Sequence, residues 1–141
     1  YVSRYLAKNI VAAGVSEKCL IQLAYAIGVS KPLSIFIKLA DEDSAKVEKV
    51  KKIIEDNFNL SPRGIREMLN LNNPIYESTS AYGHFGRKPT NKGEFSWEKT
   101  DKIDLFKLWA WKSLNFLLNI KQINKLSKWA LAHFFLGALK C

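Results

Sequence analysis

Cysteine and histidine are both scarce in this 141-residue chain, which contains two of each. Cys19 lies in an apolar run and Cys141 is the last residue, so their spacing forms neither a disulfide framework nor a zinc motif. His84 and His133 offer no Ser-His-Asp or Cys-His arrangement for nucleophilic catalysis. The few cysteines favour a reducing, cytoplasmic location, and we expect no metal ligands and no catalytic residues in the chain.

Long apolar runs and phosphate-binding loops are absent as well. No uncharged apolar stretch approaches the roughly 20 residues of a membrane span, and Tyr-Val-Ser-Arg-Tyr at the start does not resemble a signal peptide. The chain does not begin with Met, which suggests a longer reading frame. Neither glycine-rich phosphate pattern occurs. The nearest stretch, residues 83–88, has two glycines, a histidine and two cations, and we interpret it as a tight turn in preference to an anion site.

The positive charge of the chain is concentrated at one end. The net charge is +9, but residues 1–104 contain 16 Lys and Arg against 13 acids, whereas residues 105–141 contain six Lys and no acid. Because the body is nearly balanced, we expect no nucleic-acid partner for it. Binding of a membrane surface or of nucleic acid by the basic, Trp-containing tail is kept as an alternative.

Hydrophobic periodicity predicts a helix followed by a strand pair. The helix covers residues 1–13 and ends at Gly14, and an apolar run over residues 19–27 predicts a buried strand. Alternation over residues 33–39 predicts a second strand with one apolar face. The connection is too short for a parallel crossover, so the strands are expected to be antiparallel.

Two further helices are predicted after the strands. Asp43 or Ser44 can cap a helix that runs to about Asn57, and Ser61-Pro62 begins a shorter one. Asp41 and Glu42 precede the first of these helices, and we interpret this acidic group as serving the helix dipole in preference to metal binding.

The chain from residue 70 onward differs from the rest. Residues 70–100 are rich in Gly, Pro and aromatics, which predicts an ordered aromatic arm without long regular elements. Residues 105–141 have a wide apolar arc at helical spacing and predict a helical tail that folds back, self-associates or binds something. The fold class expected is α+β: a two-layer sandwich with a small mixed or antiparallel sheet and helices on one face.

Several blocks, in order and correctly spaced over residues 1–104, resemble S-adenosylmethionine synthetases (methionine adenosyltransferases). Residues 4–14, Arg-Tyr-Leu-Ala-Lys-Asn-Ile-Val-Ala-Ala-Gly, are similar to the helix after the glycine-rich motif of that family, and residues 25–35, Tyr-Ala-Ile-Gly-Val-Ser-Lys-Pro-Leu-Ser-Ile, to its strand pair. Further blocks are Asn-Phe-Asn-Leu at 57–60, Gly-Ile at 64–65, Glu-Met-Leu at 67–69, Pro-Ile-Tyr at 74–76, Ser-Ala-Tyr-Gly-His-Phe-Gly-Arg at 80–87 and Trp-Glu-Lys-Thr-Asp-Lys at 97–102.

The resemblance implies that residues 1–104 are part of the third, C-terminal domain of a synthetase. The family makes S-adenosylmethionine, phosphate and diphosphate from ATP, L-methionine and water, uses Mg²⁺ and K⁺, and shares active sites between two subunits. None of the family's catalytic or metal-binding side chains can be carried over to this chain. Only Ile27 matches a site position, an apolar residue that lines the methionine pocket, and on periodicity alone a buried strand residue is at least as well supported there.

The resemblance therefore predicts a fragment that is inactive alone and binds neither Mg²⁺ nor K⁺ by itself. Residues 105–141 match nothing in the family, and we interpret the chain as the product of a decayed gene. The alternatives are a homo-oligomer, or an interaction module that docks onto a full-length synthetase subunit. A bare sheet edge would favour such association.

Overall fold

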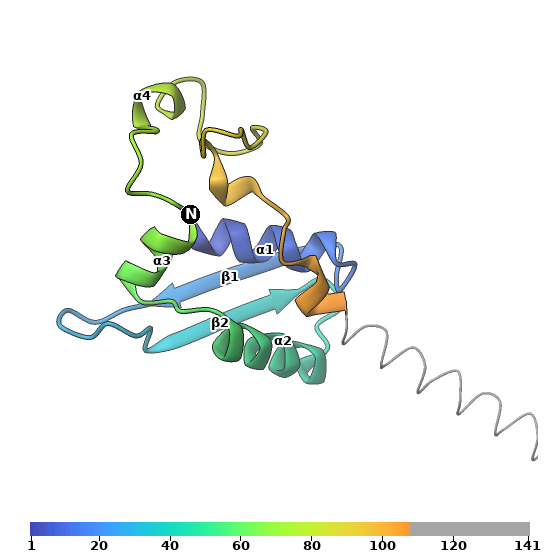
Figure 1. Cartoon of the computed structure of the whole chain (residues 1–141). Helices are drawn as coiled ribbons and strands as arrows, with labels where there is room; N and C mark the ends of the chain where they lie inside the picture. The colour runs from blue at the N-terminus through green and yellow to red at the C-terminus, as the bar shows by residue number, and fades with distance from the viewer. Residues whose placement is uncertain (108–141) are drawn as a thin grey trace, which may run out of the picture. The chain divides into compact units, whose positions relative to one another are not determined.

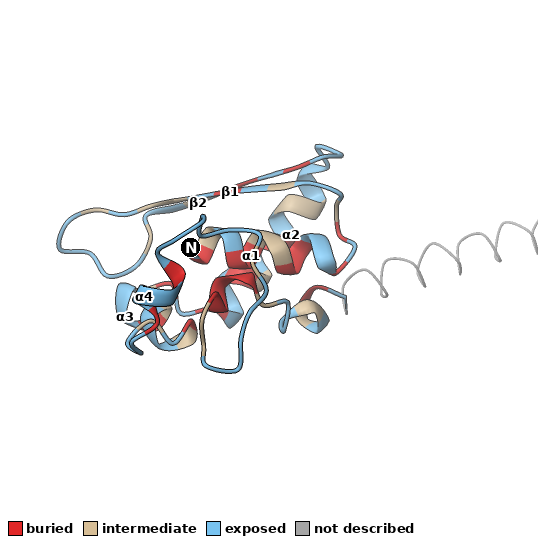
Figure 2. Ribbon diagram, turned by 90° about the horizontal axis from the view of Figure 1, so that it is seen from above, coloured by how far each residue is buried: buried red, intermediate tan, exposed pale blue. Residues whose placement is uncertain are grey.

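The computed structural model describes residues 1–107, in which a small sheet carries helices on one face (Figure 1). Figure 2 shows the sheet edge-on, with the helices on the same side of it. This arrangement confirms the predicted α+β class, whereas the helical tail expected over 105–141 lies outside the described residues from Leu108 onward. The elements in chain order are α1 (Val2–Ala12), β1 (Cys19–Ala24), β2 (Ser34–Leu39), α2 (Ser44–Asn57), α3 (Pro62–Met68), α4 (Tyr76–Thr79) and the 3₁₀ helix η1 (Ser96–Glu98).

The two strands pair in antiparallel fashion, as their short connection predicts. Cys19 lies opposite Leu39 and Ala24 opposite Ser34. Since side chains alternate between the faces of a strand, this register directs one set of apolar residues toward the helices. The inward pair Ile21 and Ile37 is buried against them. The predicted strand over 19–27 is three residues too long, because β1 ends at Ala24.

The core lies between the sheet and the helices α1 and α2. Leu6 and Ile10 of α1 and Val50 and Ile54 of α2 have no exposed surface. Each such side chain contributes about 1.5–3 kcal/mol when fully buried. Phe106 is also fully buried and stacks on Phe58 at 6.4 Å between ring centroids, so the packed unit extends at least that far along the chain. The division of the chain at residues 104 and 105 stays a prediction.

Local capping explains where two of the helices begin. The Asp43 carboxylate accepts hydrogen bonds from the backbone N–H groups of Ala45 and Lys46, and the Ser61 hydroxyl accepts one from Gly64 at 3.0 Å. Pro62 follows Ser61 at the first helical position, where its missing N–H is not needed. Both predicted caps are confirmed.

The aromatic arm is fastened to α1 through the carboxylate of Glu98. Arg4 donates from Nε to Oε1 at 3.0 Å, and Lys8 donates from Nζ to Oε2 at 2.5 Å. The backbone N–H of Gly86 donates a third hydrogen bond, to Oε1 at 2.9 Å. The Glu98 side chain has an exposed fraction of 0%, whereas those of Arg4 and Lys8 keep 41% and 29%. One buried carboxylate thus joins α1, a glycine turn and η1. We call this group of contacts, made by Glu98 with Arg4, Lys8 and Gly86, the clamp.

The same face of α1 makes a second set of contacts with residues after Glu98. The Tyr5 hydroxyl donates to Asp101 at 2.5 Å. Buried Asn9 donates to the carbonyl of Lys99 at 3.1 Å and accepts the backbone N–H of Lys102 at 2.8 Å. Arg4, Tyr5, Lys8 and Asn9 occupy positions i, i+1, i+4 and i+5 of α1, which lie on the same side of a helix. One face of α1 therefore contacts residues about ninety positions later in the chain.

The environment of Glu98 keeps its carboxylate ionised. Burial by itself would raise the pKa of Glu98, but the hydrogen bonds from Arg4, Lys8 and Gly86 outweigh burial and hold the pKa below its ordinary value. The folded state therefore favours the charged form more strongly than the unfolded state does.

Within residues 1–107, no helix has both the length and the apolar character needed to cross a membrane.

Replacement of Glu98 by Ala should lower the free energy of unfolding by about 2–3 kcal/mol, because Arg4 and Lys8 lose a buried partner but can still reach water. Urea unfolding followed by circular dichroism measures the change. Glu17→Ala, at an exposed glutamate, is the matched control and should change the free energy by no more than about 0.5 kcal/mol. Equal effects of the two variants would contradict a stabilising role for the clamp.

The clamp should also make stability depend on pH. A folded-state pKa below the unfolded one gives stability that is present above the unfolded pKa and is lost as pH falls through the folded pKa. The chain should therefore lose more stability than Glu98→Gln as pH is lowered from about 5 toward 3. Thermal unfolding midpoints across this range report the difference, and parallel curves for the two proteins would argue that Glu98 does not titrate with folding.

Candidate functional site

The connection between β1 and β2 is an exposed loop that carries the one residue matched to a family site, Ile27. The N–H of Leu33 donates to the carbonyl of Ala24 at 2.8 Å and closes the base of the loop, and Val29 bonds to Ala26 at 3.1 Å. Gly28 has a φ of +82°, a left-handed conformation that glycine adopts without steric cost. The loop is thus a defined turn at the end of the sheet (Figure 1).

Tyr25 fixes the base of this loop to the segment after α2. Its hydroxyl donates to the carbonyl of Leu60 at 2.8 Å, and partial burial raises the pKa of Tyr25 above its ordinary value. Beside this contact lies a cavity of about 430 Å³ between the start of β2 and the end of α2. Its lining combines apolar Phe58 and Leu60 with Lys31, Lys51 and Glu55, and Ile27 is not part of it.

Ile27 itself is fully exposed, with a relative exposed surface of 106%. The interpretation of Ile27 as a buried strand residue is therefore wrong. The apolar run that suggested a long strand leaves the sheet at Ala24, and its last residues enter the turn. Its assignment to a methionine pocket stays a prediction. The loop presents three more large apolar side chains to solvent: Tyr25, Val29 and Leu33.

Residues 83–88 form a turn whose polar groups pair locally. Gly83 and Gly86 both have positive φ, and the Gly86 N–H is directed at the Glu98 carboxylate. Arg87 donates to the carbonyl of Ala81 at 3.2 Å and lies over the Phe95 ring at 4.6 Å. These contacts support the interpretation as a tight turn, because the Gly86 N–H and the Arg87 guanidinium already have partners inside the arm.

His84 belongs to an aromatic cluster at the start of the chain. The indole N–H of Trp97 donates to the His84 carbonyl at 2.7 Å, and the Tyr1 hydroxyl is hydrogen-bonded to His84 Nδ1. Tyr1 meets Trp97 edge-on at 4.7 Å between ring centroids, and Phe85 lies 5.5 Å from Tyr1. The cluster gives His84 a packing role. The other histidine, His133, lies outside the described residues.

The carboxylates of Asp41, Glu42 and Asp43, before and at the start of α2, already form structural contacts. Asp43 caps the helix, and Asp41 forms an ion pair with Lys46 that holds the pKa of Asp41 below its ordinary value. Glu42 pairs with Lys38 at 3.3 Å. In the part of the chain that the structure describes, no three His, Cys, Asp or Glu side chains are grouped so that they could hold a metal ion.

Cys19 is half-buried at the start of β1, and burial raises the pKa of its thiol to about 11. Such a thiol is largely protonated at neutral pH and is a poor nucleophile.

Sequence reasoning did not identify Glu98 as the centre of the arm. A carboxylate directly after Trp97, within an aromatic segment, is the signal that could have found it, because a charged residue that packs among aromatics is rarely buried without a partner.

Known proteins match about three quarters of the chain. The sequence profile of the S-adenosylmethionine synthetase C-terminal domain matches residues 1–99. S-adenosylmethionine synthase of Pelagibacter ubique is 68% identical over 106 residues, which cover 75% of this chain and 27% of that protein. The enzyme of the same name from Parvibaculum lavamentivorans is 61% identical over 107 residues, or 76% and 28% of the two chains.

A solved structure supports the same assignment. An unusual S-adenosylmethionine synthetase from Campylobacter jejuni superposes with a TM-score of 0.65 at 38% identity, covering 76% of this chain and 28% of that one. The chain thus spans little more than a quarter of the length of the relatives it matches. Through residues 1–99, the chain belongs to the S-adenosylmethionine synthetase family and corresponds to its C-terminal domain.

Proposed function

We propose that residues 1–107 act as the C-terminal domain of an S-adenosylmethionine synthetase and supply scaffold and one apolar wall to a substrate site completed by other parts of the enzyme. The match over residues 1–99 to the C-terminal domain carries the proposal. The reaction of such an enzyme joins the sulfur of L-methionine to C5′ of ATP and releases phosphate and diphosphate. A cytoplasmic location and the decayed-gene interpretation stay predictions.

Ile27 is the residue that we assign to the substrate site. Its side chain is fully exposed on a loop whose base is held by the Tyr25–Leu60 and Leu33–Ala24 hydrogen bonds. A fixed, exposed apolar side chain suits contact with the apolar part of methionine once a second surface covers the loop. An apolar contact of this kind discriminates by about 1–3 kcal/mol per methylene.

Mg²⁺ and K⁺, which the family uses, would be held elsewhere in a complete enzyme. Asp41, Glu42 and Asp43 already serve an ion pair, a second ion pair and a helix cap. In this proposal residues 1–107 contribute no ligand to either ion.

The outer face of the sheet supports association with the rest of a synthetase. Leu20 and Phe36 are 59% and 52% exposed. They alternate with the buried Ile21 and Ile37, so they lie on the face opposite the helices, and Figure 2 shows no helix on that side of the sheet. An apolar sheet face of this kind is normally covered. The alignment covers 27% and 28% of the two matched relatives, so about three quarters of each relative lies outside it. We propose that this additional part of a synthetase covers the face.

The purified chain should form no S-adenosylmethionine from ATP and methionine with Mg²⁺ and K⁺. A chimera, in which the 106 matched residues replace their counterparts in the 68%-identical relative, should form it. Both are assayed by chromatographic detection of the product. Turnover by the chain alone, or a folded chimera without activity, would overturn the proposal.

Within that chimera, Ile27→Ala should raise the KM for methionine about tenfold, because it removes apolar contact with the substrate. The matched control is Val29→Ala on the same exposed turn, which should leave KM near that of the parent chimera. Equal KM values for the two variants would argue against Ile27 as a wall of the methionine site.

A further inference from the structure

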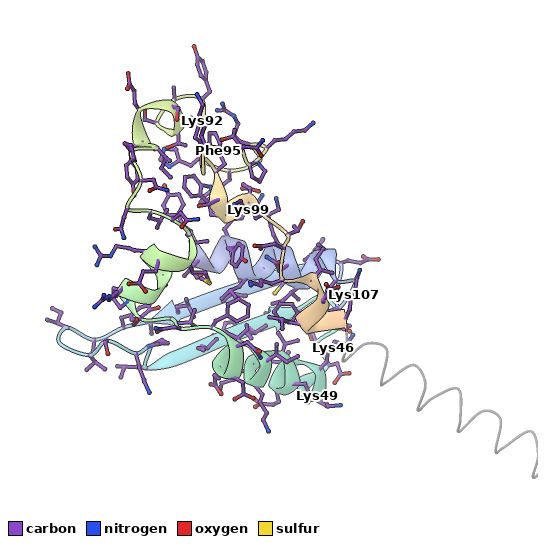
Figure 3. All side chains as sticks on the ribbon, viewed as in Figure 1. Lys46, Lys49, Lys92, Phe95, Lys99 and Lys107 are labelled. Atoms are coloured by element: carbon purple, nitrogen blue, oxygen red, sulfur yellow. The ribbon has the colours of Figure 1, made fainter. Side chains whose placement is uncertain are left out.

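A second cavity, of about 380 Å³, lies between the turn that follows α3 and the loop over residues 89–93. It lies within the aromatic arm, where Figure 3 labels two of its lysines, Lys92 and Lys99. The lining residues with polar side chains are Asn70, Asn73, Thr90, Asn91, Lys92 and Lys99. No carboxylate belongs to the lining itself, but the neighbouring Glu94 carboxylate accepts a hydrogen bond from Thr90 and is attracted by the charge of Lys92.

The walls of this cavity are held by short-range hydrogen bonds. Asn70 has a φ of +53° and its carbonyl accepts the N–H of Asn73 at 3.3 Å, which shapes the first wall. In the second wall, Gly93 donates to Thr90 at 3.2 Å and Thr90 donates to Glu94 at 3.1 Å. The walls therefore have defined positions before any ligand is bound.

Two longer-range contacts fix these walls relative to each other. Ser96 donates its hydroxyl to the carbonyl of Leu69 at 2.5 Å and ties η1 to the end of α3. The carbonyl of Lys99 accepts a hydrogen bond from Asn9 of α1 at 3.1 Å. Lys99, which lines the cavity, is thus anchored by its backbone.

The lining has the chemistry that an oxygen-rich anion requires. Lys92 and Lys99 give the lining two positive charges, of which that of Lys92 also interacts with Glu94 beside the cavity, and the carboxamides of Asn70, Asn73 and Asn91 can each donate hydrogen bonds. The Thr90 hydroxyl is already used, since it donates to Glu94 at 2.8 Å. A divalent cation does not fit, because such ions prefer carboxylate ligands. An apolar ligand would find no large apolar side chain among the lining residues.

The geometry points to a binding site for a phosphate group, held by Lys92 and Lys99 and oriented by the side-chain amides of Asn70 and Asn73. The phosphate can come from inorganic phosphate or from a phosphorylated small molecule such as a nucleoside monophosphate. This inference goes beyond the proposed synthetase role. The site is complete within residues 1–107, so its test does not depend on catalysis.

Titration of the full chain with inorganic phosphate, and separately with a nucleoside monophosphate, tests the site. Backbone amide signals of Asn73, Gly93 and Lys99 in ¹⁵N-resolved NMR spectra should shift in a saturable way. Tighter binding of the nucleotide would identify a phosphorylated small molecule as the ligand class, and equal binding would identify the phosphate group alone. Absence of saturable shifts at these three residues with either probe would overturn the proposal.

Charge-matched double variants separate the cavity from general attraction to a basic protein. Lys92→Gln with Lys99→Gln should weaken phosphate binding by about tenfold or more. Lys18→Gln with Lys52→Gln removes the same charge at exposed positions outside the cavity and should leave the affinity close to that of the parent chain. If both double variants lose affinity equally, the binding is a net-charge effect and the site does not exist.

Asn73→Asp provides an independent check, because it places a carboxylate in the cavity with almost no change in side-chain size. Repulsion should weaken phosphate binding, while the thermal unfolding midpoint shows that the fold is retained. A folded Asn73→Asp variant that binds phosphate as well as the parent chain would contradict the proposed position of the anion.

Discussion

The carboxylate of Glu98 is the group on which the described part of the chain depends most. It is buried and ionised, a combination that is costly unless several donors surround the charge. Arg4 and Lys8 approach it from α1 and Gly86 approaches it from the glycine turn. With these donors in place, an arm that has little regular secondary structure of its own acquires a fixed position against the helical layer.

The clamp matters because the sheet alone cannot organise the domain. An isolated two-stranded hairpin is marginally stable at best in water, so β1 and β2 depend on the apolar faces of α1 and α2. The helices cover only one face of the sheet, and Leu20 and Phe36 are exposed on the other. The bare face and the loop with Ile27, which we propose to meet other parts of a synthetase, are the features that the core of this domain leaves uncovered.

The cavity proposed to hold phosphate depends on the same clamp. Lys99 follows Glu98 directly, and its carbonyl is held by Asn9 one helical turn from Tyr5. Glu98 and Asn9 therefore position both the aromatic cluster around Trp97 and the lysine that faces the cavity. Loss of the clamp would loosen one wall of that cavity as well as the arm.

Local signals in the sequence predicted much of the fold. The helix caps at Asp43 and Ser61, the antiparallel strands and the aromatic arm each follow from neighbouring residues, whose backbone preferences act over a few positions. The end of β1 was predicted less well. An apolar run in the sequence does not distinguish a buried strand from an exposed loop with apolar side chains, such as residues 25–29.

The sequence by itself determined the element types, the caps, the charge asymmetry and the family resemblance. Only the tertiary structure decided that Arg4 and Lys8 meet Glu98, that Ile27 is exposed, and that Asn70 and Lys99 share a cavity. The physical reason is separation along the chain. Contacts between residues about ninety positions apart have no periodicity that a sequence pattern reveals, and their partners are chosen by packing and by the cost of burying an unpaired charge.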